Sequence, residues 1–236
     1  MTAMGLTGFR RLALLGAFLA FCVVVLGAYV RLNHAGLGCP DWPGCYGHLT
    51  PAGAAQNADS VNAAYPDRPL EVGKAWKEML HRYLASSLGL VILALAFLAW
   101  RNRKDPRQPT ALPLALVGLV IFQGLLGMWT VTLLLKPLIV TAHLVGGLST
   151  MSLLWWLALH PTRTTRPATE AGLRRLAVIA VCVLAAQILL GGWVSTNYSA
   201  VACPDFPTCQ RSYWPDMDFR DAFVLWRGLG IDYEGG

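Results

Sequence analysis

Residues 138–159 read LIVTAHLVGGLSTMSLLWWLAL, an apolar stretch without a single charged side chain. A helix rises about 1.5 Å per residue, so about 20 apolar residues in a row cross the hydrocarbon core of a bilayer. Comparable stretches lie near residues 12–30, 83–100, 112–135 and 173–194. The sequence therefore predicts an all-α membrane protein with five spans.

The composition agrees with lipid as the main solvent of this chain. Hydrophobic residues make up 55% of it and charged residues only 14%, whereas an average soluble domain is about 25% charged. This balance excludes a soluble protease or nuclease. Arg10 and Arg11 before the first stretch resemble the start of a signal peptide, but the stretch is too long and no A-x-A cleavage site follows it. We expect a retained first span.

The net charge of +6 is distributed in a way that sets topology. Ten of the 19 Lys and Arg residues lie before the first span, between spans 2 and 3, or between spans 4 and 5, together with only two acids, Asp105 and Glu170. Cytoplasmic loops of membrane proteins carry such an excess of basic residues. We predict a bacterial inner-membrane protein with a cytoplasmic N-terminus and outer loops on the periplasmic side. No nucleic-acid partner is indicated.

A sequence repeat occurs at the ends of the first and fifth spans. Residues 27–45 read GAYVRLNHAGLGCPDWPGC and residues 191–209 read GGWVSTNYSAVACPDFPTC, with eight identities at a constant offset of 164. Both copies follow an odd-numbered span, which predicts a four-helix repeat of parallel topology. The expected units are an N-terminal four-helix half (1–165) and the start of a pseudo-symmetric second bundle (166–236).

The same offset places counterparts of His81 and His143 at positions 245 and 307, beyond Gly236. We therefore expect a fragment of a protein with about eight spans, whose C-terminal half is incomplete here. The alternative is a natural half-size protein with a vestigial fifth span.

Two of the five histidines lie at matching depth in the membrane. His81 opens the second span and His143 lies five residues into the fourth, and both spans enter from the outer side. An imidazole inside a bilayer is costly and marks a candidate functional site. Two that face each other across a bundle have the arrangement of a bis-histidine heme site. The alternative is that each imidazole hydrogen-bonds a neighbouring helix; His34, His48 and His160 have solvated or interfacial explanations.

Charged residues surround His81. Glu78 lies one helical turn before it on the same face, and Arg82 follows directly, where a guanidinium can pair with heme propionates. Glu78 is alternatively an interfacial partner of Lys74 or Lys77. Small residues, Gly146 and Gly147, follow His143 and permit close approach of a macrocycle or a helix.

Four cysteines lie in the predicted outer loops, as the pairs Cys39/Cys45 and Cys203/Cys209. No CxxC or HxxxH set lies nearby, so the pattern is a weak indication of zinc. A disulfide in each Pro-rich loop agrees with the oxidising outer side. Such a bond would brace a pocket or pass electrons, and the sequence leaves both open.

Together these motifs resemble the bacterial and mitochondrial heme A synthases. The resemblance rests on the segment Arg-Leu-x-x-x-Gly-Leu-x-Cys-Pro-Asp-Trp-Pro-x-Cys (31–45), on Glu78-x-x-His81-Arg82 and on Ala-His143, and it covers essentially the whole chain. It implies eight spans in two four-helix halves and oxidation of the C8 methyl of heme O to the formyl of heme A, for terminal oxidases. The resemblance thus implies an oxidoreductase that acts on the methyl group of heme O.

The resemblance also implies residue roles. His81 and His143 become axial iron ligands of the substrate heme, Glu78 the acidic residue of the chemistry, and Cys39/Cys45 and Cys203/Cys209 the outer-loop pairs. A heme b is expected in the C-terminal half, whose histidine pair has no positions in this sequence, so the fragment alone is expected to be inactive. Heme O, heme O synthase, a terminal oxidase, a quinone or other electron acceptor, and membrane lipid are the expected partners.

Two other functions fit a bis-histidine membrane protein. One is a heme b electron carrier, and the other is a heme chaperone without turnover. Neither alters its heme, so conversion of supplied heme O separates them from a synthase. Few charges lie within the spans, which argues against a transporter.

Overall fold

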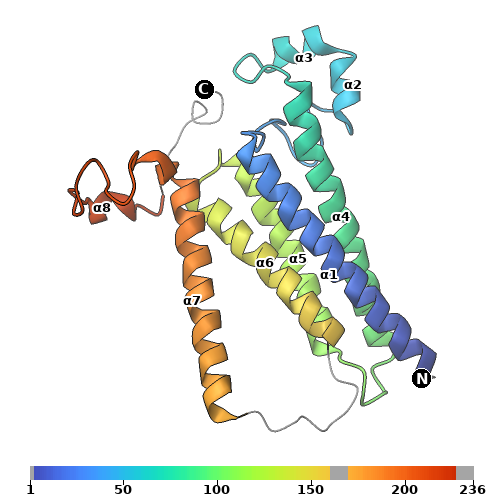
Figure 1. Cartoon of the computed structure of the whole chain (residues 1–236). Helices are drawn as coiled ribbons and strands as arrows, with labels where there is room; N and C mark the ends of the chain where they lie inside the picture. Colours follow the sequence, from blue (N-terminus) through green and yellow to red (C-terminus); the bar gives the residue numbers. More distant parts are fainter. Residues whose placement is uncertain (1–2, 160–169, 227–236) are drawn as a thin grey trace.

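The structure is a computed structural model that describes residues 3–159 and 170–226 (Figure 1). Five long helices are apolar enough to cross a membrane, which confirms the predicted number of spans. They are α1 (Ala3–Leu32), α4 (Val72–Arg101), α5 (Ala111–Thr132), α6 (Pro137–Leu159) and α7 (Ala171–Thr196). The shorter elements are α2 (Pro51–Ala55), α3 (Ala58–Ala64), the 3-10 turn η1 (Ser199–Val201) and α8 (Phe219–Ala222).

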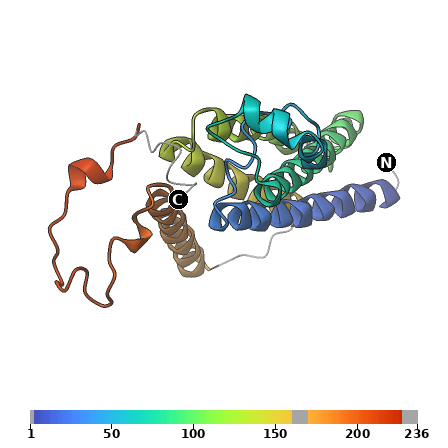
Figure 2. The ribbon, with the colours of Figure 1, turned by 90° about the horizontal axis from the view of Figure 1, so that it is seen from above.

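The first four long helices form a bundle in which each packs against two neighbours. Helix α1 contacts α4 and α6, and α5 contacts the same two helices on the other side. Within the described ranges, α4 and α6 do not pack directly on each other, so they occupy diagonal corners of the bundle (Figures 1 and 2). Side chains that point inward from α4 and α6 therefore face each other across the bundle axis.

The end of the bundle remote from the cysteine loops is a packed apolar core. We name it the lower core; it comprises Phe9, Ala13, Ala17, Ala20, Leu88, Ile92, Leu95, Ala99, Leu116, Leu154, Leu157 and Ala158. The small residues on α1 let the helices approach closely. A Cβ added at Gly16 would lie 3.3 Å from Val91 Cγ1 and 3.4 Å from Leu154 Cδ2.

Helix α4 begins earlier than its apolar stretch indicates. The sequence predicts a span from residue 83, whereas the helix starts at Val72. The extra turns are helical because the 33–71 loop covers them: Ala75, Glu78 and Met79 are all buried. Glu78 and His81 therefore lie within a regular helix and not at its start.

Helix α7 approaches α6 near its C-terminal end and diverges from it along the rest of its length (Figure 1). A Cβ at Gly192 would lie 2.8 Å from Leu144 Cδ2, and the hydroxyls of Thr141 and Thr196 are 3.2 Å apart. Most other side chains of α7 are exposed. The expected boundary between the two units at 165/166, and His160, lie outside the described residues.

Gly38 sets how closely the first cysteine loop lies on α4. A Cβ there would lie 2.7 Å from the carbonyl carbon of Lys74 and 2.9 Å from the Ala75 nitrogen. We expect Gly38→Ala to lower the free energy of unfolding by about 1–3 kcal/mol, because the loop must move off the helix. Thermal unfolding in detergent measures this. The control is Gly73→Ala, since a Cβ at Gly73 meets nothing within 4 Å; equal melting temperatures of the two variants would contradict the close packing.

Candidate functional site

The bundle contains a polar layer between two apolar regions. Below it is the lower core, and above it is a second buried cluster, the upper core, made of Cys39, Cys45, Tyr46, Ala54, Val61, Ala75 and Met79. His81 on α4 and His143 on α6 lie in the layer between them. Since α4 and α6 are diagonal, the two imidazoles come from opposite corners of the bundle.

Glycines on the other two helices make room for these imidazoles. A Cβ at Gly27 of α1 would lie 2.9 Å from Cε1 of His81, and a Cβ at Gly127 of α5 would lie 3.5 Å from Cε1 of His143. Each ring therefore lies against the bare backbone of a neighbouring helix. Any larger residue at Gly27 would displace the His81 ring.

Each imidazole has one buried nitrogen without a hydrogen-bond partner. Among the described residues, only four buried side-chain nitrogen or oxygen atoms lack one, namely His81 Nδ1, His143 Nδ1, Gln123 Nε2 and Gln108 Oε1. Buried polar groups in native proteins are normally paired, so three unpaired atoms in one layer indicate a ligand.

The donor set fits a heme better than a bare metal ion. No group of three or more His, Cys, Asp or Glu side chains suited to a metal ion occurs in the part of the chain that the structure describes. A neutral imidazole offers one lone pair, and heme iron needs only axial ligands because the macrocycle supplies the others. Two imidazoles with unpaired nitrogens on diagonal helices therefore fit the axial positions of one heme.

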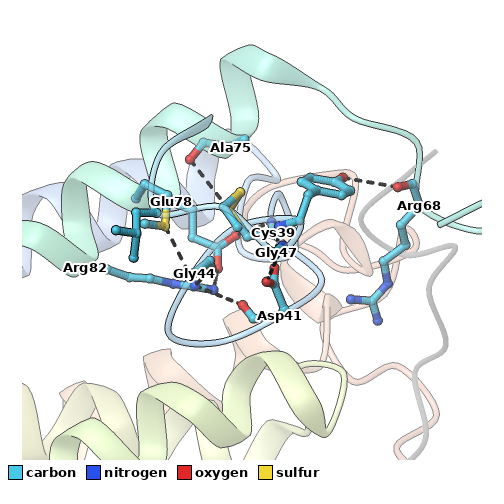
Figure 3. The surroundings of a disulfide bond; sticks show 12 residues. Cys39, Asp41, Gly44, Gly47, Arg68, Ala75, Glu78 and Arg82 are labelled. Carbon is cyan, nitrogen blue, oxygen red and sulfur yellow. Dashed lines mark hydrogen bonds and ion pairs between the residues drawn. A yellow bond between two sulfur atoms is a disulfide. The ribbon is translucent and has the colours of Figure 1, made fainter. Parts of the chain in front are cut away.

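Glu78 and Arg82 connect this layer to the first cysteine loop (Figure 3). The Cys39 N–H donates to Glu78 Oε2 at 2.9 Å, and Arg82 donates to the other carboxylate oxygen. The Arg82 guanidinium also donates to the carbonyls of Asp41 at 2.9 Å, Gly44 at 2.6 Å and Pro43 at 3.3 Å. The pair thus clamps the loop onto α4, one turn from His81.

The loop has its own internal bonds. Asp41 accepts from the main-chain N–H groups of Tyr46 at 2.6 Å and Gly47 at 2.8 Å. Cys39 and Cys45 form a disulfide and are fully buried. The Tyr46 hydroxyl lies 3.1 Å from the Arg68 carbonyl oxygen and 3.2 Å from that of Pro69, and burial raises the pKa of Tyr46 to about 12. The hydroxyl therefore stays protonated and donates a hydrogen bond at every physiological pH.

The second loop repeats this arrangement at the same offset of 164. Cys203 and Cys209 are disulfide-bonded, and Asp205 accepts from the N–H groups of Gln210 at 2.8 Å and Arg211 at 3.0 Å. His34 and its counterpart Tyr198 both have positive φ, as do Tyr46 and Gln210. The second loop extends away from the bundle, with Phe206 96% exposed (Figure 2). The local sequence therefore suffices for the loop conformation, without a clamping helix.

The structure brings together the predicted site residues Glu78, His81, Arg82 and His143, and both cysteine pairs are bonded as the disulfide interpretation predicts. The Arg82 guanidinium donates hydrogen bonds to carbonyl groups of the first cysteine loop, which the sequence did not indicate. Sequence reasoning also missed Gln123. A single polar side chain in the middle of an apolar span was the available signal.

The clamp predicts a difference between the two disulfides. We expect Arg82→Ala to speed reduction of Cys39–Cys45 by about tenfold or more, because removing one partner of a buried ion pair costs about 3–5 kcal/mol. A membrane-impermeant phosphine followed by thiol labelling and mass analysis measures the rate. Cys203–Cys209 is the internal reference, and Lys74→Ala, at an exposed pair with Glu71, is the control variant. An unchanged ratio of the two rates in Arg82→Ala would show that the clamp does not hold the loop.

Comparisons with known proteins identify the family of this chain. The family model for cytochrome oxidase assembly proteins matches residues 10–232. The heme A synthase of Shewanella oneidensis is 44% identical over 99% of this chain and 70% of its own length. Those of Alkalihalophilus pseudofirmus and Rhizorhabdus wittichii are each 30% identical, over 83% and 86% of this chain and 62% and 64% of their own lengths.

The chain thus spans between 62% and 70% of the length of these relatives. No solved structure matches it. The family model covers nearly the whole sequence, and the relatives share the heme A synthase name. The chain therefore belongs to the family of cytochrome oxidase assembly proteins that includes the heme A synthases.

Proposed function

We propose that the protein is a heme A synthase, which oxidises the C8 methyl of heme O to a formyl group for use by terminal oxidases. One observation carries this proposal: two buried imidazoles on diagonal helices each have one nitrogen without a partner among the residues that the structure describes. Family membership supports an enzyme that acts on heme. Amino-acid side chains cannot oxidise a methyl group alone, so the iron of the bound heme supplies the redox chemistry.

His81 and His143 are the proposed axial ligands of the substrate heme. The glycines that border their rings, Gly27 and Gly127, leave the imidazoles free of competing side chains. The lower core fills the bundle beneath them with apolar side chains, and ionised propionates are costly there. In this proposal the propionates point toward the first cysteine loop, where Arg82 lies. The Arg82 guanidinium then pairs with the propionates and also donates hydrogen bonds to the loop carbonyls.

Glu78 is the proposed acidic residue of the reaction. It lies one turn from His81 and is 4% exposed, in contact with the Cys39 N–H and the Arg82 guanidinium. With water as the oxygen source, each oxidation step from methyl to formyl releases protons and an electron pair. Glu78 accepts protons in this scheme and passes them toward the loop. The electrons leave to an external acceptor, a quinone or another carrier.

The remaining parts of the proposal concern the whole protein in its membrane. We place it in a bacterial inner membrane with a cytoplasmic N-terminus and the cysteine loops on the periplasmic side, because the basic connections lie at the opposite end. Residues 1–165 form the substrate half, and 166–236 begin a second half that carries a heme b. Heme O synthase delivers the substrate, and a terminal oxidase receives the product.

The experiment that tests this function supplies heme O to the purified protein with an electron acceptor and analyses the extracted hemes by chromatography with mass detection. We expect heme A and its hydroxylated precursor. Heme O recovered unchanged, with heme B bound, would favour the electron-carrier function. Heme O that is bound and released unchanged would favour a chaperone.

Glu78→Gln separates binding from chemistry. The amide still accepts the hydrogen bond of Cys39 but cannot take up a proton. We expect heme O retention near the wild-type level and a conversion rate about 10²–10⁴-fold lower, the usual contribution of a general acid or base. Stopped-time heme extraction measures both quantities on the same sample. Conversion of heme O at the wild-type rate would show that Glu78 takes no part in the chemistry and only holds the first cysteine loop.

A further inference from the structure

Gln123 is a buried amide that neither the fold nor the proposed chemistry requires. It lies in the middle of α5, in a span that otherwise consists of apolar or small residues, and it is 8% exposed. Its Nε2 donor group is buried and has no partner within the described residues. An unpaired donor in a membrane interior is costly, because no water is available to replace the lost bond. A bound ligand that accepts a hydrogen bond would remove this cost.

The amide lies beside the histidine layer. Gln123 packs against Gly146, one turn after His143 on α6, so closely that any Cβ at Gly146 would overlap the amide group. Gly127, one turn after Gln123 on α5, borders the His143 ring, because a Cβ there would lie 3.5 Å from Cε1 of His143. Helices rise about 1.5 Å per residue, so Gly146 lies about 4.5 Å deeper than His143. The amide is therefore next to the iron ligand, on the side toward the lower core.

The same glycine also lines an apolar groove. The groove has a volume of about 520 Å³, lies between α5, α6 and α7, and includes Gly146 in its wall. Phe122, Leu138, Val145, Leu189 and Leu190 also line it. Gly146 therefore borders both the Gln123 amide and this apolar groove, one turn from a proposed heme ligand.

Heme O carries this combination of groups. It differs from heme B in one ring substituent, where a hydroxyl-bearing carbon and a long isoprenoid tail replace a vinyl group. We propose that Gln123 donates a hydrogen bond to this hydroxyl and that the groove holds the isoprenoid tail. This inference rests on the proposed function and assigns the selection of heme O over heme B to Gln123. The depth of the amide agrees with it, since the edge of the macrocycle remote from the propionates carries the tail.

The physical basis of the selection is the unpaired donor. A site built to hydrogen-bond a substrate hydroxyl discriminates strongly against an analogue that lacks it, because its buried polar group is then left without a partner. Heme B has no hydroxyl for Gln123 and no tail for the groove. Both features therefore favour heme O while leaving the axial ligation by His81 and His143 the same for the two hemes.

The test is a competition between heme O and heme B for the chain of residues 1–236 in detergent, read by extraction and chromatography of the retained heme. We expect the wild type to retain heme O in excess. Gln123→Met has a side chain of similar size without the donor. It should keep the wild-type heme content and Soret band, and its preference for heme O over heme B should fall about tenfold. Gln108→Met is the control, because Gln108 is also buried with an unpaired atom but lies in the connection at the far end of the bundle.

A second variant tests the groove separately. Leu190→Trp fills it from α7 and should reduce retention of heme O while retention of heme B stays unchanged. Wild-type preference in both Gln123→Met and Leu190→Trp would overturn the inference, and the groove would then be a site for lipid acyl chains. A wild type that binds neither heme would instead overturn the proposed function, which keeps the two failures distinct.

Discussion

A polar atom buried in a membrane bundle must find a partner, because lipid offers none. Within residues 3–159 and 170–226, the unpaired buried side-chain atoms of the bundle helices are two imidazole nitrogens and one amide in a single layer; the fourth, Gln108 Oε1, lies in a connection. The lower core beneath the layer is fully apolar, and the upper core above it is closed by a disulfide. This layer is where we propose that a ligand with two axial positions and a hydrogen-bond acceptor binds.

The hydrogen bonds that Glu78 and Arg82 make with the first cysteine loop hold this loop over the layer. Arg82 offers its donors to loop carbonyls that would otherwise be unpaired beside the membrane, and the Glu78 carboxylate balances its charge. The second loop has the same internal bonds and the same left-handed residues, but its cysteine-bearing part extends away from the bundle, with Phe206 96% exposed. The loop conformation is therefore local, whereas its position over the histidine layer depends on α4.

The sequence predicted those features that depend on neighbouring residues or on composition. Apolar run length gave the five spans, and the matching depth of His81 and His143 gave the histidine layer. The sequence repeat at an offset of 164 is matched by a shared backbone conformation of the two cysteine loops. The contact of Cys39 with Glu78 joins residues far apart along the chain, so no periodicity indicated it. The early start of α4 was missed for the same reason, since a tertiary contact buries its polar turns.

Gln123 shows a different limit of sequence reasoning. A lone glutamine in an apolar span is polar but uncharged, so its position alone did not separate a packing role from a binding role. The structure shows that its amide occupies the space left by the missing side chain of Gly146. It also shows that the Gln123 Nε2 has no hydrogen-bond partner among the described residues. That His81 and His143 bind a heme remains a prediction, now supported by unpaired nitrogens at the expected places.

The measurement that tests the central claim most directly is near-infrared magnetic circular dichroism, combined with electron paramagnetic resonance, on the oxidised chain of residues 1–236 loaded with heme O. Two imidazoles on one iron give a low-spin ferric signal with the charge-transfer band of bis-histidine ligation. The account requires this signal in the wild type and its loss in both His81→Ala and His143→Ala. A high-spin iron in the wild type, or a bis-histidine signal that survives either substitution, would contradict it.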